Sequence, residues 1–191
     1  MGPESTITQR YIALLRAINV GGHTVKMDHL RKLFEELEFS SIETFIASGN
    51  VIFDSPEENT GDLEKRIASY LKEALGYEVA TFIRSASEIT EIVNYQPFPA
   101  EELAAEGTSL YVAFLAALPG DERQQKLMGY RSSVDDFHIH GREVYWLCRT
   151  KMSESLFSGA LLEKTLGMSA TMRNSTTVKK LALKYGQVSP R

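Results

Sequence analysis

The chain has 191 residues, of which 43% are hydrophobic and 24% are charged, and its formal net charge at pH 7 is −4. This composition is that of an ordinary globular protein, and the net negative charge argues against a broad surface for nucleic acid or anionic membranes. A single cysteine, Cys148, cannot form an internal disulfide. Because no apolar stretch resembles a membrane span or a signal peptide, we expect a cytoplasmic protein with no membrane partner.

The first half predicts a strand, a helix, a hairpin, a second helix, a fourth strand and a short trailing helix. The opening strand, residues 10–17, is apolar on both faces, which is typical of a central strand. Ser85 and Glu88 form a capping box that opens the trailing helix. After the opening strand, the next element is a helix with an apolar stripe at Leu30, Leu33, Phe34 and Leu37, followed by strands over 42–47 and 51–54 that are joined at Ser48-Gly49-Asn50. A second helix has an apolar stripe at Leu63, Ile67, Tyr70, Leu71 and Leu75 and is ended by Gly76. A strand over 79–83 then precedes the trailing helix.

The second half repeats this order. Residues 11–15 match residues 111–115 type for type, which is the mark of duplicated architecture. The repeated elements cover 109–117, 121–130, 136–140, 143–148, 158–166 and 170–174, followed by a helix lined by Val178, Leu181, Ala182 and Tyr185. The predicted fold class is therefore α+β, with two tandem ferredoxin-like (β-α-β-β-α-β) units, antiparallel sheets of strand order 4-1-3-2, and helices on one face of each sheet.

The same pattern sets the domain boundaries. We expect a first unit with its trailing helix over 9–96 and a second unit with its trailing helix over 109–187. The segment 97–108 reads as a connector, because prolines at its start interrupt both the helical and the strand periodicity.

One loop of the first half has no counterpart in the second half. The differing positions are Arg16 against Ala116, Asn19 against Pro119, and Gly21-Gly22 against Asp121-Glu122. Glycines leave backbone N–H groups accessible at a strand-to-helix turn, where the helix dipole adds positive potential. With Lys26 nearby, this loop predicts a cradle for a phosphate or carboxylate group. An arginine at the depth of a central strand needs an anionic partner, and we expect the partner of Arg16 to be a ligand.

The predicted hairpin is expected at the same end of the sheet. In this topology the first and second strands run in the same direction, so the loop after the first lies beside the turn after the second. Ser48, Gly49 and Asn50 would then complete a polar pocket with Asn19. The alternative is that both segments are simply favourable turns.

Other polar residues are weaker candidates. Arg173 and Asn174 close the last strand, and they could bind the same ligand only if the two halves bring them to it. His23 and His29 flank the glycine loop, where a histidine suits an acid or base but is also common on a surface. The pair His138 and His140 shares a strand face, although no fitting third ligand beyond Asp135 or Asp136 stands out, and we predict no metal site.

Three segments occur in an order that resembles the bacterial domain of unknown function 1697 family. They are Arg16-Ala17-Ile18-Asn19-Val20-Gly21-Gly22, Ser48-Gly49-Asn50-Val51 and Thr171-x-Arg173-Asn174. The resemblance covers essentially the whole chain and implies a tandem α+β fold. It implies no activity. The sequence departs from the family pattern after Asn174, where Ser175-Thr176 stands in place of Trp-Asn.

The leading functional hypothesis is the binding of a small anionic ligand, bearing a phosphate or carboxylate group, at the loop after the first strand. Because no pair of nucleophile and base is visible, the sequence assigns no reaction class, catalytic residue or cofactor, and whether the protein is an enzyme is left open. The alternative is a non-catalytic module that binds a protein or RNA through a sheet face. The candidate stacking aromatics for RNA are Phe45, Phe53, Tyr145 and Trp146, but the glycine-aromatic signature of an RNA-recognition strand is missing.

Overall fold

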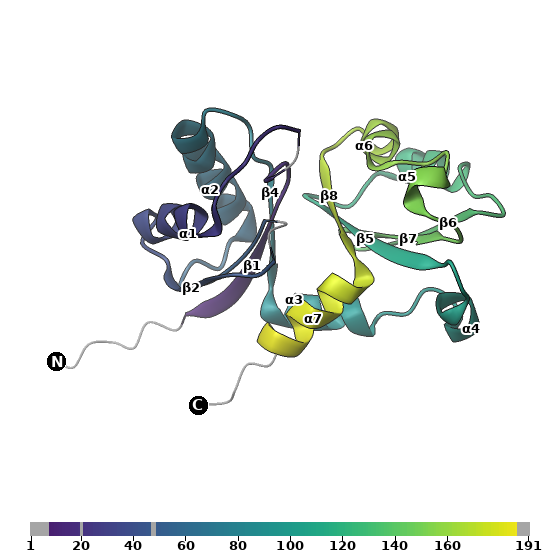
Figure 1. Ribbon diagram of the computed structural model, residues 1–191, viewed down its shortest axis with the longest axis horizontal. Coiled ribbons are helices and arrows are strands. Elements are labelled where there is room, and N and C mark those ends of the chain that lie inside the picture. The colour runs from purple at the N-terminus through teal and green to yellow at the C-terminus, as the bar shows by residue number, and fades with distance from the viewer. Residues whose placement is uncertain (1–7, 20, 47–48, 187–191) are drawn as a thin grey trace. The chain divides into compact units, whose positions relative to one another are not determined.

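The computed structural model describes residues 8–19, 21–46 and 49–186 (Figure 1). The strands are β1 (Gln9–Leu15), β2 (Ser40–Thr44), β3 (Asn50–Ser55), β4 (Thr81–Ser85), β5 (Ser109–Leu115), β6 (Asp135–His140), β7 (Glu143–Cys148) and β8 (Ala170–Asn174). The helices are α1 (Met27–Glu36), α2 (Thr60–Leu75), α3 (Ala86–Asn94), α4 (Ala100–Ala104), α5 (Asp121–Met128), α6 (Gly159–Leu166) and α7 (Ser175–Tyr185), with a 3₁₀ turn, η1, at Met152–Glu154.

The strands form two four-stranded antiparallel sheets, which makes the protein a mixed α+β fold. Their orders are β2-β3-β1-β4 and β6-β7-β5-β8, and the predicted order 4-1-3-2 is therefore confirmed. The two sheets also share their register, since Tyr11 lies opposite Phe53 in the first and Tyr111 opposite Trp146 in the second.

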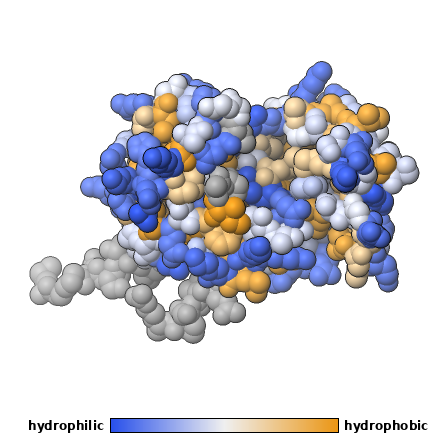
Figure 2. Space-filling view, in the orientation of Figure 1, coloured by the Kyte–Doolittle hydropathy of each residue, from blue (hydrophilic) through white to orange (hydrophobic). Residues whose placement is uncertain are grey.

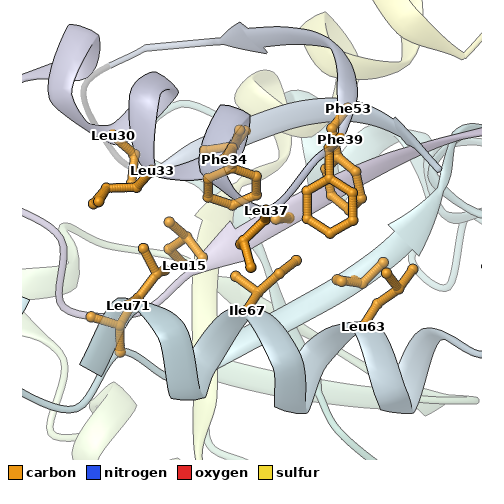
Figure 3. Packing of buried hydrophobic residues seen from close by; sticks show 14 of the residues in the cluster. Leu15, Leu30, Leu33, Phe34, Leu37, Phe39, Phe53, Leu63, Ile67 and Leu71 are labelled. Atoms are coloured by element: carbon orange, nitrogen blue, oxygen red, sulfur yellow. The ribbon is translucent and has the colours of Figure 1, made fainter. Parts of the chain in front are cut away.

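In the first sheet, one face is covered by α1 and α2. Period-2 alternation turns Tyr11, Ala13 and Leu15 of β1 toward these helices, where they join the apolar stripes of α1 and α2 in one buried cluster. Figure 3 shows Leu63, Ile67 and Leu71 of α2 pointing toward the side chains of Leu15, Leu37 and Phe39. Phe34, Phe39 and Phe53 add ring contacts with centroids 4.4–6.1 Å apart.

The helix-covered core of the second sheet is built around Trp146, which packs on Phe137 and Phe157. The indole Nε1 donates to Oδ1 of buried Asp135 over 2.8 Å, and Ser155 Oγ donates to Oδ2 over 2.8 Å. Asp135 is thus a hydrogen-bond hub that satisfies two polar groups in an otherwise apolar region.

The predicted ends of α2 and α6 are confirmed. Gly76 and Gly167 are left-handed C-caps of α2 and α6, with φ of 79° and 65°. The capping box is also present, because Ser85 N donates to Glu88 Oε2 over 2.7 Å and Glu88 N donates to Ser85 Oγ over 3.1 Å.

Two local predictions are corrected. The first strand ends at Leu15 instead of residue 17, because Ala17 takes a left-handed φ of 66° that turns the chain out of the sheet. The connector 97–108 contains α4, for which Pro99 is the N-cap residue. A proline is tolerated there because the first N–H groups of a helix have no intrahelical partner.

The chain divides into two compact units, Met1–Glu88 and Ile89–Arg191, at a point within α3. The second half of α3 belongs to the second unit through its hydrogen bonds. Tyr145 Oη donates to the carbonyl of Ile92 over 3.1 Å, and Thr90 Oγ1 donates to that of Gly186 over 3.3 Å. The boundaries drawn from the sequence, at residues 96 and 109, stay a prediction for the extent of the functional domains.

On the face shown in Figure 2, hydrophilic side chains predominate and hydrophobic ones are interspersed among them. Among the helices in the described residues, none is long and apolar enough to cross a membrane.

Candidate functional site

The first unit has a pocket of about 570 Å³ beside the glycine loop. We call it the His23–Tyr77 pocket. It lies between the segment that leads from the loop into α1 and the C-terminal end of α2. Its lining residues are Gly22, His23, Thr24, Val25, Lys26, His29, Ala74, Leu75, Gly76 and Tyr77.

The loop side of the pocket is held by Asn19. Its Oδ1 accepts the backbone N–H of Val25 over 2.6 Å, which closes the loop and places Val25 in the core. Asn19, Gly21 and Gly22 all have left-handed backbone, with φ of 58°, 62° and 87°. Asparagine and glycine are the residues that adopt this conformation most readily, so the loop follows from local sequence.

The first turn of α1 borders the pocket. Lys26 is the N-cap residue, is exposed, and makes no side-chain capping hydrogen bond. Asp28 lies in the same turn but is paired with Arg31 over 3.0 Å. The helix dipole and the Lys26 ammonium therefore both favour an anion on this side.

Two aromatic rings, His23 from the loop and Tyr77 from beyond α2, also line the pocket. Gly76 ends α2 and reverses the chain, so that Tyr77 packs against the core of the first unit. The imidazole of His23 stacks on Tyr77, with ring centroids 3.8 Å apart and planes 20° from parallel. Tyr77 Oη is buried with no hydrogen-bond partner among the described residues. Burial raises the pKa of Tyr77, so the phenol keeps its proton.

The described residues that line this pocket include Lys26 and no acidic residue. By contrast, a pocket of about 540 Å³ beside β3 contains Glu38, Glu57 and Glu58. A third pocket, of about 410 Å³ between α5 and α6, also has no acidic residue among its described lining residues. Its cations are Arg123, Lys126 and Lys164, of which Lys126 is paired with Glu122 over 2.7 Å.

Of the residues predicted from the sequence, Gly22 and Lys26 line the His23–Tyr77 pocket, together with the flanking His23 and His29. Arg16 does not line it. Because β1 ends at Leu15, Arg16 is exposed, and the expectation of an arginine buried at the depth of a central strand is wrong.

The predicted hairpin lies where the topology places it, but the side chain of Asn50 bonds to the turn itself. Leu15 N donates to the Gly49 carbonyl over 2.8 Å, which joins the hairpin to the end of β1. Asn50 is fully buried, and its Nδ2 donates to the carbonyl of Phe45 over 2.9 Å. Gly49 and Asn50 are not among the lining residues of the pocket, and Ser48 lies outside the described residues.

Arg173 and Asn174 belong to the second unit. Arg173 is buried and donates to Thr171 Oγ1 over 2.8 Å and to the Met172 carbonyl over 2.9 Å, and burial lowers its pKa to about 10. Asn174 is the N-cap residue of α7 and accepts from Thr176 N over 2.8 Å. Its side chain therefore has a structural role.

The arginine on the last strand is a duplicated feature that the sequence analysis missed. Arg84 lies opposite Ile12 just as Arg173 lies opposite Val112, and Arg84 donates to the carbonyl of Ile83 over 2.8 Å. A residue present in both copies is more readily explained by the fold than by a ligand site.

His138 and His140 do share a face of β6, but Tyr95 occupies the space beside them. Tyr95 Oη lies 2.6 Å from His138 Nε2, and its ring stacks on His140 at 4.0 Å. Burial lowers the pKa of His138, as do His140 and Arg131, while Asp136 opposes them. Within the described part of the chain, no group of three or more His, Cys, Asp or Glu could hold a metal ion.

We expect the second unit to lose stability in mild acid through His138. A histidine whose folded pKa lies below its unfolded value stabilises the fold above the unfolded pKa, and this contribution is lost as the pH falls through the folded pKa. Urea unfolding of the wild type and of His138→Gln at pH 7.5 and 5.0 measures it. The wild type should lose more free energy of unfolding than the variant, and equal losses would contradict this assignment.

The sequence did not indicate that Tyr77 and the end of α2 belong to the site, because these residues are remote in sequence from the glycine loop. The only local signal was Gly76, which marks where α2 ends and the chain turns back.

Comparisons with known proteins identify a family and a fold. The family model described as Protein of unknown function (DUF1697) matches residues 8–145. This range includes the pocket and excludes Arg173 and Asn174. Among solved structures, the chain is similar to the conserved bacterial protein SP0830 from Streptococcus pneumoniae, with 20% sequence identity and a TM-score of 0.73 over 95% of this chain and 100% of that one. No match was found among curated proteins.

Proposed function

Since the chain belongs to the DUF1697 family of proteins of unknown function, its function has to be inferred from its own residues, and we propose that it binds a small anionic ligand in the His23–Tyr77 pocket. The ligand class is a metabolite that bears a phosphate or carboxylate group. The observation that carries this proposal is a pocket of about 570 Å³ with Lys26 on one wall and no acidic residue among its described lining residues. Small-molecule sites have volumes of roughly 300–1,000 Å³.

The lining residues have separable roles in this proposal. Lys26 supplies the charge that neutralises the anion. Gly22 leaves its backbone open, since an added Cβ would meet no atom within 4 Å. His23 and His29 supply ring nitrogens that can donate hydrogen bonds to the anion. Because the described hydrogen bonds join no nucleophile to a base among the lining residues, the proposal is one of binding and names no reaction.

We also infer that each unit is a ferredoxin-like module and that the protein works in the cytoplasm. The first inference is supported by the β-α-β-β-α-β order and by the shared strand order of the two sheets. The second is supported by the sequence, because its single cysteine cannot form an internal disulfide and so does not require an oxidising compartment.

The alternative function, binding of RNA or a protein through a sheet face, gains no support from the candidate aromatics. Phe53, Tyr145 and Trp146 are at most 1% exposed. Base stacking needs an aromatic ring with an open face, so these three side chains serve the core instead.

Lys26→Gln is the variant that tests the proposed function. We expect phosphorylated and carboxylated metabolites to raise the melting temperature of the wild type, because a ligand that binds only the folded state stabilises it, by about 2.7 kcal/mol at 100 times Kd. Loss of one charge-assisted contact should weaken binding by about tenfold or more. The measurement is thermal shift over a titration of each metabolite.

Lys32→Gln is the matched control, since Lys32 is an exposed lysine of α1 that does not line the pocket. Its titrations should match those of the wild type. If Lys26→Gln and Lys32→Gln respond alike, the anion binds elsewhere and the proposed function is wrong.

A further inference from the structure

The His23–Tyr77 pocket has a flat aromatic wall in addition to its cation. Stacking on Tyr77 covers one face of the His23 imidazole, and the His23 side chain as a whole is exposed. Tyr77, in turn, is fixed from behind by the core of the first unit. The outer face of His23 is therefore a supported platform on which a second planar group can stack.

The volume of the pocket also points to more than an inorganic ion. The pocket is open to solvent, and its volume of about 570 Å³ lies within the range for whole small-molecule ligands. Lys26, at the start of α1, and the stacked rings of His23 and Tyr77 are all among its lining residues. A ligand that contacts both has a charged group and a planar group.

We propose that the ligand of this pocket is a nucleoside phosphate, with its base stacked on His23 and its phosphate beside Lys26. The inference rests on the proposed function and adds the substrate class. Bases stack on histidine as on other aromatic side chains, and such stacking tolerates different bases because each has a π-face. The residues that line the pocket do not identify which base is bound.

A variant of Tyr77 separates the effect of its ring from the effect of its hydroxyl group. Tyr77 Oη has no partner among the described residues, so Tyr77→Phe removes an unsatisfied group and keeps the ring. This variant should fold as stably as the wild type or more so. It should also keep the preference for a nucleoside phosphate over a sugar phosphate, because that preference comes from the stacked rings.

The test compares four probes by calorimetry: adenosine 5′-monophosphate, ribose 5-phosphate, adenosine and inorganic phosphate. We expect the wild type to bind the monophosphate about tenfold more tightly than ribose 5-phosphate. His23→Ala should lose this preference while still binding ribose 5-phosphate, and His23→Phe, which restores a ring, should regain it.

Proton NMR of the histidines gives an independent readout, because the chain has four histidines. A stacked base should shift the ring protons of His23, assigned with His23→Ala, and leave those of His138 and His140 in place.

Two results separate the inference from the proposed function. Equal affinity for the monophosphate and ribose 5-phosphate, still dependent on Lys26, would overturn the nucleoside inference and leave the anion site standing. Binding of the monophosphate that is the same in Lys26→Gln and Lys32→Gln would overturn both.

Discussion

Replacement of Gly49 by alanine is expected to lower the free energy of unfolding by about 2–5 kcal/mol. Gly49 has a left-handed φ of 76°, in which an L-residue costs roughly 1–2 kcal/mol. An added Cβ would also lie 3.1 Å from Ile18 Cβ, 3.2 Å from Leu15 Cβ and 3.3 Å from the Leu15 carbonyl oxygen. Overpacking of this kind adds about 1–3 kcal/mol, because the end of β1 has to move.

Gly22→Ala is the control that isolates the steric part. Gly22 has a similar φ of 87°, but a Cβ there would meet nothing within 4 Å. Chemical denaturation should therefore give a loss of only about 1 kcal/mol for Gly22→Ala. If the two variants lose the same free energy, the close approach of the hairpin to β1 is not what requires glycine at position 49.

Asp135→Leu should cost the second unit about 3 kcal/mol. The substitution leaves the indole N–H of Trp146 and the hydroxyl of Ser155 without their buried acceptor. Each unsatisfied buried group costs about 1–3 kcal/mol. The measurement is denaturant unfolding followed by the fluorescence of Trp146, which is the one tryptophan of the chain.

Asp135→Asn is the matched control. Its side-chain oxygen can still accept from Trp146, and its amide can donate to Ser155 Oγ, so the loss should stay near 1 kcal/mol or below. Equal losses in the two variants would mean that the negative charge of Asp135, and not its hydrogen-bonding geometry, holds this core together.

The order of the elements could be predicted because it depends on periodicities that are local in the sequence. The stripe of α2, its left-handed cap at Gly76 and the capping box at Ser85 each occupy a few consecutive residues. The duplicated pattern around Tyr11 and Tyr111 then fixed which strand is central in each half.

The candidate site could be predicted only in part, because it joins segments that are remote in sequence. On the loop side, Gly22 was visible as a feature of one copy alone, and Lys26 was predicted because it follows that loop. The aromatic wall was not, because the stack of His23 on Tyr77 depends on tertiary packing. Asn50 illustrates the reverse case, since a polar turn residue looks the same in sequence whether it binds a ligand or a backbone carbonyl.

Backbone conformation explains the misplacement of Arg16. Ala17 is a non-glycine residue with positive φ, and such residues are uncommon enough that apolar patterning does not anticipate them. The same turn that ends β1 at Leu15 takes the arginine to the surface.

Chemical-shift mapping of the full chain tests the anion site most directly. In a ¹H–¹⁵N titration with a phosphorylated metabolite that raises the melting temperature, the account predicts that the perturbed amides cluster at residues 22–29 and 74–77. Perturbations centred on the pocket of Arg123, Lys126 and Lys164, or on Asn50 at the hairpin, would contradict it.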